Sequence, residues 1–235
     1  MIIKRRGNIF TTQCQTIVNT VNCVGVMGVG IAYEFRLRES DMFEKYKVLC
    51  EQEKMEIGKL WIYSIEGENL SYAKILNFPT KHNWKYPAKE EYLHKGLQKF
   101  LDTNKEKGIE SAAFPLLGAD RGGIDKDRSV EIMESYLGKC DIDVEIWEFD
   151  PIAKDDLYEY FKSIFNEIDD ETIKTESKIR INFVRKVRSV IDSRDINSLS
   201  GLLRVKGIGE VTLEKLFKYV KSYKKSNNLF NYESC

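Results

Sequence analysis

Two glycine-rich segments could bind phosphate, because each stands between an expected strand and an expected helix. Residues 19–32 contain Gly25, Gly28 and Gly30, and residues 115–125 contain three more glycines. Glycine lets a backbone turn with positive φ and approach a ligand closely. The amides of such a turn, together with the N-terminus of the next helix, form a site for an anion. Two such loops at one edge of a sheet can hold a diphosphate from both sides, and a pair of structural turns is the alternative.

One lysine is expected beside these loops. Lys81 comes shortly after the apolar run 73–78, so it lies near the same end of the sheet. Beside a dry pocket the pKa of a lysine amine falls, and the amine can then act as a nucleophile or a proton donor. A solvated surface lysine is the alternative interpretation.

Strands that alternate with helices predict an α/β fold whose largely parallel or mixed sheet is covered on both faces. The expected strands span residues 2–4, 16–20, 60–64, 73–78, 111–116 and 144–149. The expected helices span residues 30–38, 42–53, 90–104 and 127–137. The third helix is clearly amphipathic, with its apolar face formed by Leu93, Leu97, Phe100 and Leu101.

A domain boundary is expected after Asp150, because Pro151 disfavours helix in the residue before it. Beyond it the pattern is helical only, over residues 157–165, 179–190, 196–203 and 211–223. We therefore expect an α/β domain over 1–151, a linker or helix over 152–175 and a small all-α domain over 176–235.

The composition argues against several classes of protein. Hydrophobic residues make up 42% and charged residues 31% of the chain, a balance typical of soluble globular proteins. No apolar run approaches the ~18 residues that cross a bilayer. The N-terminal residues lack the pattern of a signal peptide, so we expect a cytoplasmic protein that contacts no membrane. No C-x-x-C pair occurs, and we expect no disulfide framework, metal site or cofactor from the scattered cysteines: Cys14, Cys23, Cys50, Cys140 and Cys235.

The two glycine-rich loops and the segment 77–81, taken together and in this order, resemble a macrodomain. Residues 22–32 and the Asn-Phe-Pro-Thr-Lys run are similar to DarG-type antitoxin macrodomains, which are related to the terminal ADP-ribose glycohydrolases. The resemblance covers about residues 1–150. It implies a three-layer α/β/α fold with a mixed sheet and ADP-ribose in a surface cleft. DarG-type domains remove ADP-ribose from thymidine in single-stranded DNA, so the resemblance also implies a DarT-type toxin whose modification is reversed.

The resemblance assigns roles to individual residues. Lys81 matches the lysine on which glycohydrolase activity depends, and Asn22 would hydrogen-bond the distal ribose. Phe149 matches the region that packs on adenine. The other residues expected to contact ADP-ribose are Asn8, Ile9, Gly25, Val26, Met27, Gly28, Gly30, Thr80, Leu117, Gly118, Ala119, Asp120, Arg121, Gly122, Gly123 and Ile124.

Two positions depart from the family pattern. Asn8 stands where many macrodomains have an aspartate that accepts a hydrogen bond from the adenine amino group, and the asparagine carbonyl can accept the same bond. Asp120 replaces a small residue of the second loop. It is a candidate general acid or base, or a loop carboxylate that caps a turn, and its spacing favours the second interpretation.

Residues 203–216 resemble a helix-hairpin-helix element. Its expected turn is Gly207, Ile208 and Gly209, whose backbone amides would contact a DNA phosphate. Lys206 and Lys215 would add a salt-sensitive attraction. Residues 172–226 hold 14 basic and 5 acidic side chains, which favours single-stranded or damaged DNA as the partner of this module. A helical hairpin that packs against a protein is the alternative.

These features together predict a DNA ADP-ribosyl glycohydrolase that is tethered to DNA by its second domain. A reader that binds ADP-ribose without turnover and a hydrolase of glutamate-linked ADP-ribose on protein are the alternatives. The DNA-like module disfavours a phosphatase or deacetylase of small ADP-ribose derivatives. A dehydrogenase is disfavoured, because the glycine spacing differs from the dinucleotide fingerprint and no acidic residue is placed for the ribose.

Overall fold

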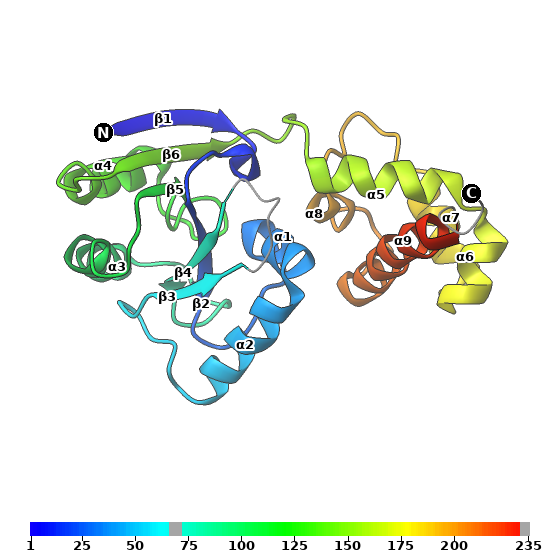
Figure 1. Ribbon diagram of the computed structural model, residues 1–235, viewed down its shortest axis with the longest axis horizontal. Coiled ribbons are helices and arrows are strands. Elements are labelled where there is room, and N and C mark those ends of the chain that lie inside the picture. The colour runs from blue at the N-terminus through cyan, green and yellow to red at the C-terminus, as the bar shows by residue number, and fades with distance from the viewer. Residues whose placement is uncertain (66–71, 231–235) are drawn as a thin grey trace. The chain divides into compact units, whose positions relative to one another are not determined.

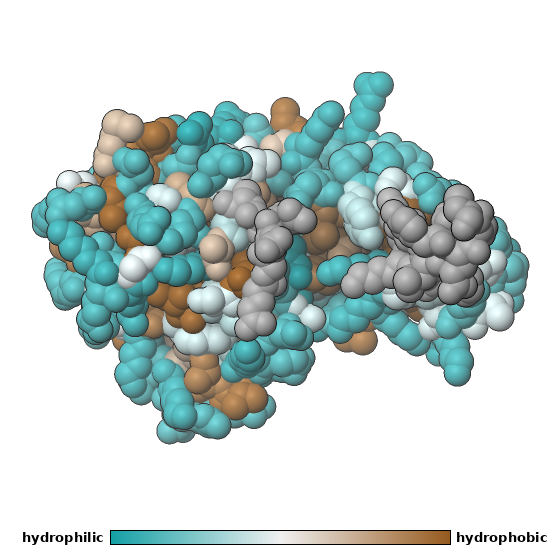
Figure 2. All heavy atoms as spheres, viewed as in Figure 1, coloured by the Kyte–Doolittle hydropathy of each residue, from teal (hydrophilic) through white to brown (hydrophobic). Residues whose placement is uncertain are grey.

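The computed structural model divides the chain into two compact units, Met1–Pro151 and Ile152–Cys235. The structure describes residues 1–65 and 72–230, with side chains as far as residue 223. Within these residues no helix is long and apolar enough to cross a membrane. Hydrophilic side chains cover most of the face in Figure 2, and hydrophobic ones reach the surface in separate patches. Four cysteines are free thiols, and Cys235 lies outside the described residues.

The first unit contains a six-stranded mixed sheet in the order β1-β6-β5-β2-β4-β3. Its strands are β1 (Ile2–Gly7), β2 (Thr16–Asn22), β3 (Trp61–Ser64), β4 (Lys74–Lys81), β5 (Ser111–Pro115) and β6 (Asp143–Phe149). Neighbouring strands run parallel except at the edge, where β3 is antiparallel to β4. The mixed sheet expected from the sequence is confirmed.

Helices cover both faces of this sheet (Figure 1). α1 (Gly30–Arg38) and α2 (Ser40–Glu51) pack on one face, and α3 (Glu90–Thr103) and α4 (Lys126–Leu137) pack on the other. Ile17 of β2 belongs to the core beneath α1 and α2, whereas the next residue, Val18, belongs to the core beneath α3 and α4. Because successive strand side chains point to opposite faces and both faces are covered, the central strands β2, β4 and β5 are buried along most of their length. The α/β/α architecture is thus confirmed.

α3 packs against β4, the strand that carries Lys81, where Gly96 meets the ring of Phe78. Leu93, Leu97 and Phe100 are buried on the face of α3 that meets the sheet. A Cβ atom at Gly96 would lie 2.2 Å from Cζ of Phe78, so only glycine fits there. The absence of a side chain lets the helix approach the strand, and the strand therefore has little freedom to shift.

Two features of the first unit differ from the sequence expectation. β4 continues through Pro79 to Lys81, although we expected the strand to end at Phe78. β3 pairs with β4 only as far as Asn77, so Pro79 falls where β4 has become an edge strand and a missing N–H costs no ladder bond. A short 3-10 helix, η1 (Ile9–Thr11), was not expected, and it begins where the side chain of Asn8 accepts a hydrogen bond from the Phe10 amide.

The second unit is entirely helical in its described residues. Its helices are α5 (Asp156–Glu167), α6 (Asp170–Ser177), α7 (Ile181–Arg188), α8 (Leu199–Leu202) and α9 (Glu210–Phe230). α5 and most of α6 lie in the segment 152–175. Phe161 and Phe165 of α5 are fully buried, and the Phe161 ring lies 6.2 Å from that of Phe217 in α9. This segment is therefore part of a helical core.

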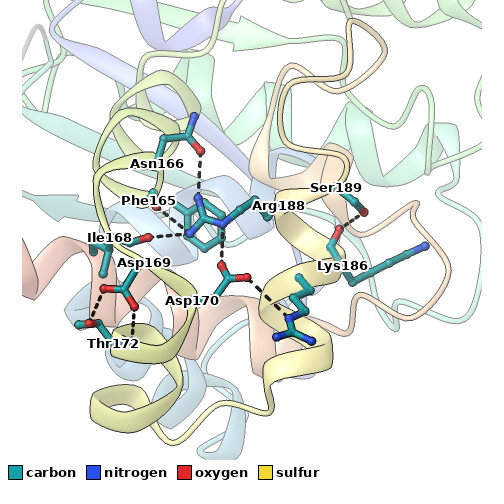
Figure 3. Close-up of polar contacts among 10 residues, drawn as sticks. Phe165, Asn166, Ile168, Asp169, Asp170, Thr172, Lys186, Arg188 and Ser189 are labelled. Atoms are coloured by element: carbon teal, nitrogen blue, oxygen red, sulfur yellow. Dashed lines mark hydrogen bonds and ion pairs between the residues drawn. The ribbon is translucent and has the colours of Figure 1, made fainter.

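Arg188 joins α5, α6 and α7 (Figure 3). Its guanidinium donates hydrogen bonds to the Ile168 carbonyl at 2.7 Å and to Oδ1 of Asp170 at 2.6 Å, and it lies 4.3 Å above the Phe165 ring. The end of a helix leaves carbonyl groups without partners, and Arg188 supplies donors to those of α5. Arg185 also pairs with Asp170, at 3.9 Å. Part of the basic block in the sequence is therefore structural.

Candidate active site

The expected site residues gather at the carboxyl ends of β2, β4 and β5. β2 pairs with β4 along its whole length, and a register irregularity after Val21 sets Asn22 opposite Lys81. β2 pairs with β5 only at Thr16 and Ile17. The carboxyl ends of β2 and β5 are therefore no longer hydrogen-bonded to each other where the two loops begin. The end of β4 lies beside the end of β2.

Asn22 organises the first loop, which links β2 to α1. Its side-chain Nδ2 donates to the Val26 carbonyl at 2.6 Å, and its Oδ1 accepts from the amides of Val24 and Val26 at 3.0 and 3.3 Å. The side chain is 7% exposed. The sequence resemblance assigned Asn22 to the distal ribose, whereas in this structure both ends of its amide hold the loop backbone.

Tyr46 of α2 holds Asn22 in place by a hydrogen bond. Its hydroxyl donates to the Asn22 carbonyl at 2.7 Å and lies 3.1 Å from Oδ1 of the same residue. Burial raises the pKa of Tyr46, so the hydroxyl keeps its proton and remains a donor. The loop also rests on α2 at Gly25, which has a φ of +78° and whose added Cβ would lie 3.6 Å from Cβ of Cys50.

The second loop, which links β5 to α4, closes on itself. The Gly122 amide donates to the Ala119 carbonyl at 2.7 Å, and the Ile124 amide donates to the Gly118 carbonyl at 3.0 Å. A Cβ atom at Gly122 would lie 2.0 Å from the Gly118 carbonyl oxygen, so this turn requires glycine. Asp120, at its tip, is exposed and has a φ of +46°, in the left-handed region that aspartate tolerates better than most residues.

The end of β4 joins the two loops. Nζ of Lys81 donates to the Arg121 carbonyl of the second loop at 2.5 Å. The Cys23 amide of the first loop donates to the His82 carbonyl at 3.0 Å, and the Ala88 amide donates to the Gly122 carbonyl at 2.9 Å. Burial, and to a smaller extent the Arg121 charge, lowers the pKa of Lys81. The lysine is thus a partly desolvated amine held between two glycine-rich loops.

The remaining expected residues divide into buried and accessible ones. Five of them are buried in this structure: Ile9, Met27, Thr80, Leu117 and Ala119. Partly or fully accessible positions lie along the two loops: Val26, Gly28, Gly30, Arg121, Gly123 and Ile124. Gly30 has a φ of +60° at the start of α1, and an added Cβ would meet no atom there.

Asn8 and Phe149 lie together at the ends of the neighbouring strands β1 and β6. Gly7 and Phe149 are register partners, and Asn8 follows directly. Phe149 is 52% exposed, so its ring is available to a planar ligand. Oδ1 of Asn8 accepts from the Phe10 amide at 3.0 Å.

In the second unit, the expected hairpin lies between α8 and α9. The side chains of Lys206 and Lys215 are exposed, whereas that of Ile208 is buried and anchors the turn. Gly207 has a φ of +93°, which explains glycine at that position. An added Cβ at Gly207 or Gly209 would meet no atom within 4 Å, so the surface of the turn is open.

Sequence analysis missed the roles of Tyr46 and of Ala88. Tyr46 lies on the buried face of an expected helix, where an aromatic residue signals only packing. The Ala88 amide acts through the backbone, which leaves no mark in the sequence.

A surface hollow beside β3, lined by Leu49, Trp61 and several lysines, includes none of the residues expected at the site.

The sequence of the first unit is similar to that of known proteins. The family model described as Macro domain matches residues 18–133. The DNA ADP-ribosyl glycohydrolase of Thermus aquaticus is 36% identical over 151 residues, which cover 63% of this chain and 40% of that protein. The chain thus spans about two fifths of the length of the curated relatives it matches.

Solved structures match the same region. The macrodomain of Mycobacterium tuberculosis DarG has a TM-score of 0.60 at 36% identity, over 63% of this chain and 97% of that one. DarTG of Thermosipho africanus in complex with ADP-ribose has a TM-score of 0.57 at 32% identity, over 60% of this chain and 40% of that one.

Replacing Tyr46 with phenylalanine tests the support of the first loop. We expect Tyr46→Phe to lower the free energy of unfolding by about 1–3 kcal/mol, because the backbone carbonyl of Asn22 loses the hydroxyl that donates to it. Tryptophan fluorescence during urea unfolding reports on the first unit, since Trp61, Trp84 and Trp147 all lie in it. Tyr86→Phe is the matched control, because Tyr86 is 67% exposed and its substitution is expected to change stability by less than about 0.5 kcal/mol. Equal stability of the two variants would contradict the assignment.

Proposed function

This chain belongs to the macrodomain family, and from that premise we propose that its first unit removes ADP-ribose from a base of DNA, most readily thymidine. The observation that carries the proposal is the hydrogen bond from Nζ of Lys81 to the Arg121 carbonyl. It holds a partly desolvated amine between the two loops that would bind the diphosphate. The names of the DNA ADP-ribosyl glycohydrolases that the chain resembles support the choice of DNA.

ADP-ribose fits the arrangement of the loops. The amides of the two glycine-rich loops would donate hydrogen bonds to the diphosphate. Phe149 and Asn8, at the ends of β1 and β6, would contact adenine, and Arg121 and the loop residues around it would surround the distal ribose. Asn22 acts indirectly in this proposal, because its side chain orders the first loop.

Lys81 would act on the glycosidic bond between the distal ribose and the base. In the hydrolysis a water oxygen bonds to C1″, the C1″–N bond breaks, and the base nitrogen recovers a proton from water. An ammonium group beside the departing base stabilises the negative charge that develops on it. A neutral Lys81 amine would instead attack C1″ and displace the base, which takes up a proton. Water would then hydrolyse the new C1″–N bond, which releases ADP-ribose and restores the amine. The lowered pKa of Lys81 is compatible with either role, as a proton donor or as a nucleophile.

Asp120 is proposed to shape the second loop. Its backbone is left-handed and its side chain is exposed at the loop tip. Aspartate adopts this conformation at lower cost than most residues. The backbone geometry therefore explains why an aspartate stands at this position, and a role in proton transfer is not needed to explain it.

The second unit is proposed to bind DNA and to hold the first unit near its substrate. In the described part of the chain, Lys206 and Lys215 are exposed and form no ion pair. Lys206 directly precedes the open turn at Gly207 and Gly209, and Lys215 lies in α9, which follows the turn. The N-terminus of a helix attracts phosphate. The relative from Thermosipho africanus is named a fusion of a DNA ADP-ribosyl transferase with a DNA ADP-ribosyl glycohydrolase. A separate DarT-type transferase is therefore the proposed source of the substrate.

Replacing Lys81 tests the catalytic assignment. We expect Lys81→Ala to lower kcat on an ADP-ribosylated oligonucleotide by about 10²–10³ and to leave the Kd for ADP-ribose within about threefold. Lys74→Ala is the matched control, because Lys74 begins the same strand and its Nζ donates to the Gly108 carbonyl at 2.6 Å, away from the loops. Lys81→Arg keeps the charge and removes the nucleophile, so retained activity in it favours the electrostatic route.

Unchanged turnover in Lys81→Ala would reject the assignment of Lys81. A wild-type chain that binds ADP-ribose but hydrolyses no DNA-linked form would point to a reader. Release of ADP-ribose from glutamate-modified protein alone would point to a protein hydrolase.

Substituting the hairpin lysines tests the tether. We expect the double variant Lys206→Ala and Lys215→Ala to raise KM on ADP-ribosylated DNA by at least about tenfold at low salt, and to leave ADP-ribose binding unchanged. The slope of log KM against log salt should also fall by about 1–2, because two phosphate contacts are lost. Lys174→Ala serves as a control, because Lys174 pairs with Glu171 at 2.7 Å. Equal effects of control and double variant would count against tethering by the hairpin.

A further inference from the structure

We propose that residues 82–88, the rim segment, form a stacking platform for the unpaired bases that flank the modified nucleotide. This inference rests on the proposed function and names the residues that would contact the strand on either side of the modified nucleotide. The rim segment follows Lys81 directly and links β4 to α3.

Both ends of the rim segment are fixed to the glycine-rich loops. At its start the His82 carbonyl accepts from the Cys23 amide of the first loop at 3.0 Å. At its end the Ala88 amide donates to the Gly122 carbonyl of the second loop at 2.9 Å. Pro87 also lies 4.0 Å from a Cβ atom built on Gly123. The middle of the segment is therefore held beside the proposed site.

Two large aromatic side chains project from this middle part. Trp84 is 51% exposed and Tyr86 is 67% exposed. The turn that carries them is ordered, because the Lys85 amide donates to Oδ1 of Asn83 at 3.0 Å and the Tyr86 amide donates to the Asn83 carbonyl at 3.2 Å. The fold does not bury these rings, so a ligand with planar apolar faces would gain from covering them.

The charge around the aromatic residues matches a nucleic acid. Residues 81–89 contain Lys81, Lys85 and Lys89 and no acidic residue. Nζ of Lys85 lies 5.6 Å from the centre of the Trp84 ring, so a cation accompanies the exposed face. Proteins that bind single strands combine aromatic residues that stack on bases with basic groups that track the phosphates. Bases inside a duplex are already stacked, so this arrangement favours a single strand.

Fluorescence of the full chain tests the platform without reference to catalysis. We expect an unmodified ten-nucleotide single strand to quench the emission of Trp84, and a duplex of the same sequence to require at least about tenfold higher concentration. The Trp84→Phe variant identifies the signal, because Trp61 and Trp147 are less exposed. Absence of any difference in quenching between wild type and Trp84→Phe would overturn the proposal.

Kinetics of the full chain test the contribution to the substrate. We expect Trp84→Ala and Tyr86→Ala each to raise KM for an ADP-ribosylated decamer by about tenfold. KM for the ADP-ribosylated nucleoside and the Kd for ADP-ribose should stay within about twofold. Trp84→Tyr retains a stacking ring and should restore most of the loss.

The outcomes separate the platform from the proposed function. An equal loss on decamer and nucleoside would overturn the platform, because the aromatic residues would then act on the site itself. No change on the decamer would overturn it as well. If the wild-type chain hydrolyses no DNA-linked ADP-ribose, the proposed glycohydrolase fails, and the quenching experiment alone decides the platform.

Discussion

The pairing of Asn22 with Lys81 across β2 and β4 is the constraint on which the candidate site depends. It places one residue that orders the first glycine-rich loop next to one that reaches the second. Gly96 allows α3 to hold β4 from one face of the sheet, and Tyr46 of α2 holds Asn22 from the other. The loops are thus held by contacts with the sheet and its helices, which is the kind of support that electrostatic preorganisation requires.

In the second unit, contacts within the fold decide which basic side chains remain available to a ligand. Arg188 and Arg185 are occupied with Asp170 and with the end of α5, and Lys218 pairs with Glu214. Lys206, which precedes the open glycine turn, and Lys215 of α9 have no such partner among the described residues. The number of basic residues in this unit is therefore larger than the number of positive side chains that a ligand could contact. Whether a basic residue has a structural role or a binding role depends on its position in the fold.

The sequence predicted the order of the elements, the two loops and the place of Lys81, because these follow from local patterns. Alternation of strand and helix identifies a parallel sheet, and the carboxyl ends of its strands meet at one edge. Long-range contacts could not be predicted in this way. The hydroxyl of Tyr46 reaches Asn22 from a different helix, and Pro79 is tolerated in β4 only because β3 stops at its pairing with Asn77. The contact of Asn22 with the distal ribose stays a prediction, and the hydrogen bonds of its side chain to the loop backbone could not be foreseen from the sequence.

Calorimetry of the full chain with ADP-ribose and with adenosine tests the central claim, that two ordered glycine-rich loops hold a diphosphate. Adenosine shares the base but lacks the phosphates that the loops would bind. Because a hydrogen bond to a charged group contributes about 1.5–3 kcal/mol, loss of even two such bonds predicts at least about 100-fold weaker binding of adenosine. Saturable heat with ADP-ribose and this difference in Kd are the expected result. No heat with ADP-ribose, or equal affinity for both ligands, would contradict the account.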